Sequence, residues 1–199
     1  MEQKIGVLMQ KIITPCVILA GGKSSRFGSD KTQIHFGGYP LSQWVFSRFS
    51  EVCENLYMSI KQRDKFEFHA RFLVESSPIY APMVGMIHAF EELAAREIIF
   101  VSVDTPFVSY DTLCSLASCD SPIVYAQSEG KAHYLISKWQ RSMLDSLLWA
   151  YRSKSFALHR IIESHPHECI PISEAESLNI NTAQDYERAL QILKGECHG

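Results

Sequence analysis

A short segment of the chain, residues 19–31, is rich in residue types that bind phosphate groups. Its glycines and cations are Gly21, Gly22, Gly28, Lys23, Arg26 and Lys31. Glycine lets backbone N–H groups approach an anion closely, and lysine and arginine donate hydrogen bonds to phosphate oxygens. The segment follows an apolar run at residues 16–20, which predicts a buried strand, and open α/β sheets bind ligands where strands end. The pattern favours a triphosphate-binding loop, the alternative being a surface loop with solvated charges.

The spacing within this segment excludes two familiar phosphate-binding motifs. A P-loop has Lys and then Ser or Thr directly after its last glycine, whereas Gly28 is followed by Ser29 and Asp30. A dinucleotide-binding fingerprint needs G-x-G-x-x-G, and the adjacent pair Gly21-Gly22 does not have that spacing. A phosphate-binding role for this segment would therefore need another class of loop, and the surface-loop alternative stays open.

Asp104 is the second residue with potential chemistry. It stands where a strongly apolar run, residues 98–103, ends, and the predicted strand would place it at the ligand-facing edge of the sheet. A carboxylate there suits Mg²⁺, which takes few protein oxygens together with phosphate oxygens and water. An aspartate that starts a turn before Pro106 is the alternative, and the local sequence alone leaves both open.

The remaining pattern predicts the elements that position these residues. Short apolar runs alternate with longer amphipathic stretches, as in βαβ units. Strands are expected at residues 16–20, 56–60, 72–74, 98–103, 123–126 and 133–137. Helices are expected at residues 41–52, 83–95, 111–116 (capped by Asp111), 143–151, 156–163 and from a cap at Thr182 to residue 193. The expected fold is a three-layer α/β/α sandwich with a mostly parallel, Rossmann-like sheet and one or two antiparallel strands.

Length and composition fit one compact domain over residues 1–199, because a chain of this size buries roughly 70% of its unfolded surface. A net charge of -3 gives no reason to expect nucleic acid as a partner. No stretch approaches the roughly 20 apolar residues of a membrane span, and residues 1–11 lack the apolar core of a secretory leader. We therefore expect a cytoplasmic protein without a membrane partner.

Residues 19–31 resemble the N-terminal motif of nucleotidyltransferases that activate sugar phosphates, methylerythritol phosphate or molybdopterin. The version here is most similar to that of the molybdenum cofactor guanylyltransferases, the MobA family. Eight positions match in residue and spacing: Leu19, Ala20, Gly21, Gly22, Arg26, Gly28, Asp30 and Lys31. Residues 36–41, 81–86, 103–107 and 179–182 are similar to further family segments, in the family's order. The resemblance covers nearly the whole chain and implies the fold of nucleotide-diphospho-sugar transferases.

The resemblance implies transfer of GMP from GTP to the terminal phosphate of molybdopterin, with release of pyrophosphate and with Mg²⁺ as cofactor. It implies catalytic roles for Arg26, Lys31 and Asp104, with Asp104 as the Mg²⁺ ligand. The implied nucleotide-binding residues are Leu19, Ala20, Gly21, Gly22, Lys31, Ser59, Glu75 and Asp104. Asn181 and His133 are candidate contacts to the acceptor or the metal. Other molybdenum cofactor biosynthesis proteins or molybdoenzyme chaperones are implied as partners.

Three departures from the family pattern concern the base and the acceptor. Ser59 stands where the family has an asparagine, Glu75 where it often has an aspartate, and Tyr134 replaces the proline after His133. A cytidylyltransferase acting on molybdopterin or a sugar phosphate is the alternative enzyme, and its usual motif is L-A-A-G. We expect Gly21, in place of that alanine, to leave room for a purine edge. A non-catalytic nucleotide-binding regulator is the alternative outside enzymes, and the presence of Lys31 and Asp104 disfavours it.

Overall fold

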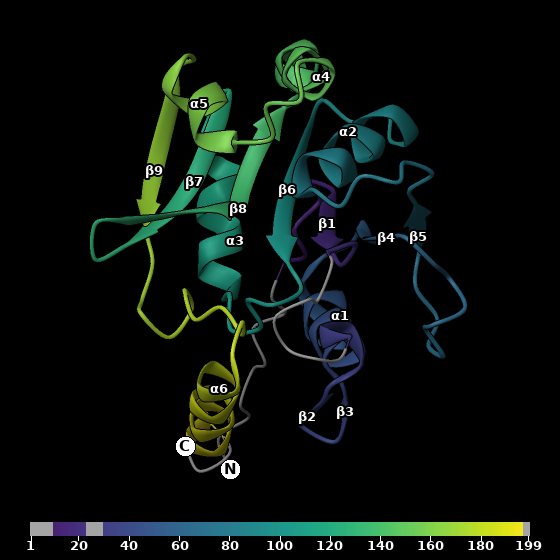
Figure 1. Ribbon diagram of the computed structural model, residues 1–199. Helices are drawn as coiled ribbons and strands as arrows, with labels where there is room; N and C mark the ends of the chain where they lie inside the picture. Colours follow the sequence, from purple (N-terminus) through teal and green to yellow (C-terminus); the bar gives the residue numbers. More distant parts are fainter. Residues whose placement is uncertain (1–9, 23–29, 197–199) are drawn as a thin grey trace.

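A mixed sheet of seven strands forms the centre of the fold, in the spatial order β5-β4-β1-β6-β8-β7-β9 (Figure 1). The structure, a computed structural model, describes residues 10–22 and 30–196. The strands are β1 (Cys16–Leu19), β4 (Leu56–Ile60), β5 (Phe72–Val74), β6 (Glu97–Ser102), β7 (Ile123–Ser128), β8 (Lys131–Gln140) and β9 (His167–Pro171). Among these described strands only β8 runs antiparallel to its neighbours. The expectation of a mostly parallel sheet is confirmed.

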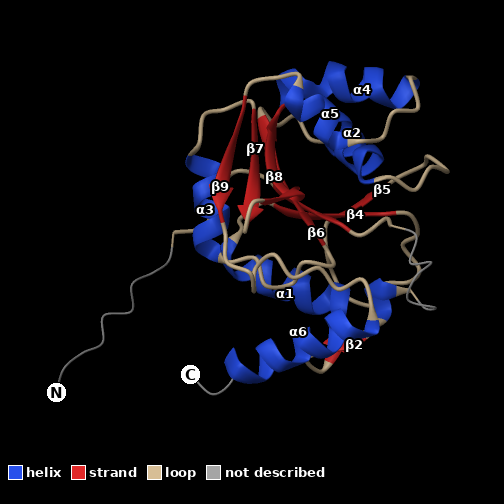
Figure 2. Cartoon of the chain, turned by 60° about the vertical axis from the view of Figure 1, so that its left-hand side comes forward, coloured by secondary structure: helices blue, strands red, loops and turns tan. Residues whose placement is uncertain are grey.

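Helices cover both faces of this sheet and give the molecule three layers (Figure 2). One face is covered by α1 (Leu41–Val52), α3 (Tyr110–Ser118) and α6 (Ala183–Glu196). The other face is covered by α2 (Pro82–Glu92), α4 (Leu144–Arg152) and α5 (Leu158–Glu163). Short 3₁₀ turns lie at η1 (Lys31–Gln33) and η2 (Arg141–Met143). No helix in the described ranges has the length and apolar character needed to cross a membrane.

The central strand β6 shows why the sheet needs both helical layers. Ile98 and Phe100 pack with α2, α4 and α5, whereas Ile99 and Val101 pack with α1 and α3 on the opposite face. All four side chains are buried, and each such burial contributes about 1.5–3 kcal/mol relative to an exposed side chain. A continuous apolar run is the pattern of a parallel strand buried on both faces.

A small hairpin, β2 (His35–Phe36) and β3 (Tyr39–Pro40), positions the segment that contains Lys31. Gly37 and Gly38 close it with φ angles of 57° and 92°, a region that favours glycine. The buried ring of Phe36 lies 6.1 Å, between centroids, from Phe107, which follows the end of β6. The hairpin is thereby packed against the chain just beyond Asp104.

Three elements differ from the sequence expectations. The hydroxyl of Ser109 accepts a hydrogen bond from the Thr112 N–H, so Ser109, not Asp111, caps α3. Helix α2 ends at Glu92, earlier than the expected end at residue 95. Strand β9 was not expected, because this edge strand is mostly exposed and lacks the apolar alternation that marks a strand.

A carboxylate anchors the loop that leads from β9 to α6. Glu176 accepts hydrogen bonds from the Ser109 N–H at 3.1 Å, the Thr112 hydroxyl at 2.5 Å, and the Ser173 N–H at 3.1 Å. Partial burial opposes ionisation of this group, but the hydrogen bonds outweigh it and lower the pKa of Glu176 to about 2. The loop is therefore tied to the start of α3 by an ionised carboxylate.

We expect the Glu176 contacts to contribute stability that is lost in acid. Because the pKa is about 2 in the fold and near 4.5 without these contacts, the contribution is complete above pH 4.5 and falls towards pH 2. Glu176→Gln should lower the free energy of unfolding at pH 7 by about 1 kcal/mol, since water screens part of the carboxylate. Urea unfolding at pH 7 and pH 3 measures this, and the difference should shrink at pH 3. Glu174→Gln, an exposed carboxylate paired with Arg188, is the control and should change little.

Candidate active site

The candidate site lies where β1, β4 and β6 end. In the parallel register Leu19 pairs with Ser59 on one side and with Ser102 on the other. The Ala20 N–H donates to the Ser59 carbonyl at 2.9 Å, and the Val103 N–H donates to the Leu19 carbonyl at 3.1 Å. These backbone bonds bring the L-A-G-G segment to the same sheet edge as the chain that leads to Asp104.

Asp104 presents a buried carboxylate oxygen at this edge. No donor among the described residues forms a hydrogen bond with its Oδ1. Burial raises the pKa of Asp104, and the Ser102 hydroxyl and the positive charge of Lys31 act against that rise. A buried acceptor without a donor fits a cation, and Mg²⁺ commonly takes only one or two protein carboxylates. The residue therefore fits the role of Mg²⁺ ligand on structural grounds.

Lys31 and Asn181 come together beside Asp104 although they are 150 positions apart in the chain. The Lys31 ammonium donates to Asn181 Oδ1 at 2.6 Å, and Asn181 Nδ2 donates to Asn179 Oδ1 at 2.8 Å. The Ile180 N–H also donates to the carbonyl of Asp104 at 2.8 Å, which attaches residues 179–182 to the end of β6. The structure thus brings together three of the residues that the sequence singled out.

The start of α6 fixes the position of Asn181. Asp185 accepts hydrogen bonds from the N–H groups of Asn181 at 3.0 Å and Thr182 at 2.8 Å, and the Thr182 hydroxyl accepts from the Asp185 N–H. This reciprocal arrangement is a helix capping box. It confirms the expected cap at Thr182 and holds the preceding asparagine towards Lys31.

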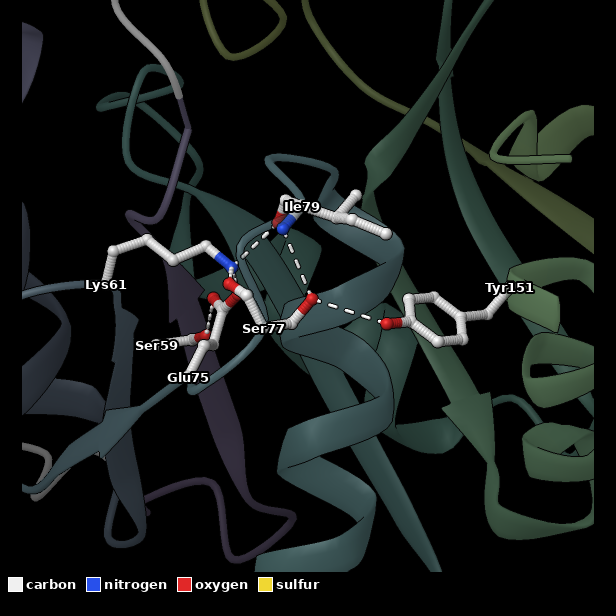
Figure 3. Close-up of polar contacts among 6 residues, drawn as sticks. All are labelled: Ser59, Lys61, Glu75, Ser77, Ile79 and Tyr151. Carbon is white, nitrogen blue, oxygen red and sulfur yellow. Dashed lines mark hydrogen bonds and ion pairs between the residues drawn. The ribbon is translucent and has the colours of Figure 1, made fainter. Parts of the chain in front are cut away.

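A second polar cluster is centred on Glu75 (Figure 3), whose carboxylate lies next to Gly21 of the L-A-G-G segment. The Ser59 hydroxyl donates to Glu75 Oε1 at 2.6 Å, and the Lys61 ammonium forms an ion pair with Oε2 at 2.6 Å. Only 4% of the Glu75 side chain is exposed. Ser59 and Glu75 were expected near the nucleotide and do meet here.

Two glycines make room for this carboxylate. A Cβ atom at Gly21 would lie 2.7 Å from Glu75 Oε1, and a Cβ at Gly85 would lie 2.8 Å from Ser59 Oγ and 3.0 Å from Glu75 Oε1. These distances are too short for relaxed contacts, so glycine is required at each position while the cluster stands. The expectation that Gly21 leaves its space to a purine edge is therefore corrected, because the Glu75 carboxylate takes that space.

His133 lies in a separate cavity of about 540 Å³ beside the same edge. Its Nε2 atom is buried without a hydrogen-bond partner among the described residues, and burial followed by the charge of Lys131 lowers the pKa of His133. The cavity is also lined by Asn181 and Arg188. The two predicted acceptor contacts, His133 and Asn181, therefore line one cavity.

Several site residues lie beyond the sequence expectations or beyond the described chain. Arg26, expected to be catalytic, lies outside the described residues. Lys61 was missed, although it follows Ser59 by two positions in extended chain and so points to the same side of the sheet. Lys131 and Arg188 were also missed, since each is an ordinary surface cation in the sequence. Lys131 and Arg188 line the same cavity only because packing brings together residues that are far apart in the sequence.

Comparison with known proteins agrees with this geometry. Residues 16–169 match the model of the MobA-like NTP transferase domain. A molybdenum cofactor guanylyltransferase of Helicobacter pylori (strain G27) is 36% identical over 93% of this chain and 96% of its own length. One of Campylobacter jejuni (strain RM1221) is 26% identical over 90% of this chain and 96% of its own. Molybdopterin-guanine dinucleotide biosynthesis protein A from Archaeoglobus fulgidus has the same fold, with a TM-score of 0.80 at 20% identity over 92% of this chain and 100% of that one.

The family match spans most of the chain, and the Helicobacter relative matches almost end to end. The fold, the glycine-rich strand end and the aspartate at the end of β6 are all in the places that the first motif led us to expect. The chain therefore belongs to the MobA-like NTP transferase family and is a nucleotidyltransferase.

Proposed function

We propose that this nucleotidyltransferase transfers GMP from GTP to the phosphate of molybdopterin and releases pyrophosphate. The observation that carries the proposal is the buried Asp104 Oδ1, which has no donor among the described residues and lies beside the Lys31–Asn181 pair. The name shared by the curated relatives, molybdenum cofactor guanylyltransferase, supports the choice of substrates.

This transfer requires the protein mainly to position the two substrates and to stabilise negative charge. The acceptor phosphate is already an anionic nucleophile, so a serine, cysteine or histidine nucleophile is not needed. Two anions must be brought together, and the developing negative charge must be stabilised. Lys31 supplies a fixed positive charge there, and we assign Arg26 a similar role. Asp104 would hold Mg²⁺, which when bound neutralises charge on phosphate oxygens.

The contact between Gly21 and Glu75 supports guanine over cytosine as the base. Cytidylyltransferases usually have an alanine at the position of Gly21, whereas the buried Glu75 carboxylate lies here where that Cβ would be. The alanine of the L-A-A-G motif would collide with Glu75 in this arrangement. A cytidylyltransferase remains the alternative function, and this contact disfavours it.

The cavity around His133 carries charges of both signs, since Glu129, Glu174 and Asp185 line it as well as two cations. Lys131 and Arg188 line it together with Asn181, whose amide is bonded to Lys31 at the donor side. An acceptor with a phosphate at its end and hydrogen-bonding ring atoms would find cations, an amide and an imidazole nitrogen there. We therefore assign this cavity to the molybdopterin phosphate and pterin.

The direct test is pyrophosphate release from each of GTP, CTP and ATP with molybdopterin and Mg²⁺. GTP should give turnover at a rate at least about tenfold above the others, the equivalent of one good hydrogen bond to a charged group. Faster pyrophosphate release from CTP than from GTP would show that the protein is a cytidylyltransferase. Tight GTP binding without pyrophosphate release would instead support the non-catalytic regulator.

We expect His133→Ala to weaken binding of the acceptor and leave binding of GTP unchanged. Loss of one hydrogen bond in a partly buried pocket corresponds to about a tenfold rise in the KM for molybdopterin. Steady-state kinetics at saturating GTP measures this rise. His159→Ala, an exposed histidine on α5 across the sheet, is the matched control. An unchanged KM for molybdopterin in His133→Ala would show that His133 does not contact the acceptor.

A further inference from the structure

Asp30, directly before Lys31, has partners on both of its carboxylate oxygens. Its Oδ1 accepts hydrogen bonds from the Thr32 N–H at 3.1 Å and the Thr32 hydroxyl at 2.8 Å, and its Oδ2 forms an ion pair with the Lys65 ammonium at 2.9 Å. The contact with the Thr32 N–H makes Asp30 the N-cap of η1, the turn that begins at Lys31. Partial burial opposes ionisation of Asp30, but the hydrogen bonds from Lys65 and Thr32 outweigh it and lower the pKa of Asp30.

Backbone hydrogen bonds fix the rest of this turn. The Gln33 N–H donates to the Asp30 carbonyl at 3.0 Å, and the Ile34 N–H donates to the Lys31 carbonyl at 3.3 Å. The Leu41 N–H, at the start of α1, donates to the Ile34 carbonyl at 2.8 Å. The backbone of Lys31 is therefore held by its N-cap on one side and by α1 on the other.

Lys65 lies in the connection between β4 and β5, and aromatic packing supports that connection. The next residue, Phe66, is buried, and its ring centroid lies 5.4 Å from that of Phe72 on β5 and 6.0 Å from that of Phe68. The ring of Phe68 lies 5.6 Å, between centroids, from Phe46 on α1. An ion pair that starts from such a supported backbone orders fewer groups than one on a free loop, so less conformational entropy opposes it.

The other end of Lys31, its ammonium, is held by different residues. It donates to Asn181 Oδ1 at 2.6 Å, and its charge acts on the carboxylates of Asp104 and Asp185. Lysine has a flexible four-carbon stem, so the position of its charge depends on where both of its ends are held. Asp30 holds the backbone end, and Asn181 holds the ammonium end.

We propose that Asp30 is a positioning residue for the transfer step and that Lys65 is its partner in this role, the two holding the turn that presents the Lys31 ammonium to the phosphate groups. This inference rests on the proposed function, in which Lys31 supplies positive charge to that step. Asp30 and Lys65 act through Lys31. Fixed charge stabilises a transition state only where it is correctly placed, and a misplacement of about 1 Å can cost about 10²-fold in rate.

The experiment measures two quantities, the Kd for GTP with Mg²⁺ by calorimetry and the single-turnover rate of pyrophosphate release at saturating molybdopterin. Asp30→Ala removes both the cap and the ion pair. We expect it to lower the rate by about 10- to 100-fold while the Kd changes by less than about threefold. Glu67→Ala, an exposed acid on the same connection as Lys65, is the control and should leave both quantities unchanged. Circular dichroism checks that each variant is folded.

A second background shows whether the effect passes through Lys31. Lys31→Ala alone should slow the transfer step, and Asp30→Ala added to it should slow that step by less than about a further threefold, because the residue through which it acts is gone. An acid that only stabilised the fold would slow the transfer step equally in both backgrounds.

Milder variants test the ion pair while the cap is kept. Lys65→Met leaves the Asp30 carboxylate as a cap, and Asp30→Asn leaves an amide oxygen that still caps the turn. Each should slow the transfer step by about 3- to 5-fold, the equivalent of an exposed ion pair, and the double variant should be no slower than either single one. Lys65→Arg should keep most of the native rate, since arginine also pairs with a carboxylate.

The outcomes separate this inference from the proposed function. If Asp30→Ala keeps a rate within about threefold of the native one, slows the native and Lys31→Ala backgrounds equally, or loses rate only through a weaker Kd for GTP, the positioning role is overturned. Additive effects of Lys65→Met and Asp30→Asn overturn the role of Lys65. In each of these cases a slow Lys31→Ala leaves the proposed function standing. A native protein that releases no pyrophosphate from GTP, or a Lys31→Ala variant as fast as the native protein, contradicts the proposed function and this inference with it.

Discussion

Asp104→Asn is expected to lower the rate of pyrophosphate release from GTP by about 10²–10⁴-fold, because a carboxylate that holds a divalent cation contributes several kcal/mol of charge stabilisation. The amide has nearly the same shape but lacks the charge that binds Mg²⁺ at phosphate oxygens. Single-turnover kinetics across a range of Mg²⁺ concentrations measures the loss. Asp111→Asn, an exposed position on α3, is the matched control. If Asp104→Asn keeps activity within about threefold of the native protein, Asp104 is not the Mg²⁺ ligand.

The same substitution should stabilise the metal-free protein. Burial raises the pKa of Asp104, so the folded state resists ionisation that the unfolded chain undergoes freely. The resulting penalty is absent below the unfolded pKa near 3.8, grows as the pH rises above that value, and is complete above the raised folded pKa. Thermal unfolding in EDTA should therefore give a higher Tm for Asp104→Asn at about pH 8, with the difference vanishing towards about pH 3.5. A loss of both activity and stability would indicate a purely structural aspartate.

Gly21→Ala is expected to have the second largest effect, through Glu75. The added Cβ would lie 2.7 Å from Glu75 Oε1, and Ser59 and Lys61 hold that oxygen's carboxylate in place. The carboxylate must therefore give up one of its contacts. We expect the KM for GTP to rise about 10- to 100-fold, the equivalent of one or two lost hydrogen bonds to a charged group.

A double-mutant cycle tests whether the effect travels through Glu75. Glu75→Asp shortens the acid by one methylene and draws the carboxylate away from the new methyl group. The double variant Gly21→Ala/Glu75→Asp should bind GTP better than Gly21→Ala alone, which gives a favourable coupling between the two sites. Gly195→Ala on α6, where a Cβ meets nothing within 4 Å among the described residues, controls for the substitution type. If the two substitutions change the affinity for GTP additively, Gly21→Ala does not act through Glu75.

Much of this fold follows from local signals. The run at residues 98–103 marks a strand buried on two faces, and the Thr182 cap marks the start of α6, because both patterns depend on neighbours in the chain. The family motif at residues 19–31 predicts the class of enzyme for the same reason. Strand β9 escaped prediction because an exposed edge strand, held by β7 on one side, needs no apolar pattern.

The site itself was only partly predictable. The sequence placed Glu75 near the nucleotide, but it could not show that Lys61 neutralises it, since the ion pair joins two strands through tertiary packing. The glycine at position 21 was correctly singled out and wrongly explained. Its absent side chain makes room for an acid 54 residues later in the sequence, which no local pattern encodes.

The hydrogen bond between Lys31 and Asn181 has a consequence for how the protein is made. Translation at about 5–20 residues per second separates the synthesis of these two residues by roughly 8–30 s, because 150 positions lie between them. During that interval the nascent chain has its glycine-rich loop and the central strands but not the amide that orients the lysine. The glycine-rich segment and every strand of the described sheet are therefore synthesised before Asn181 is added and can form this pair.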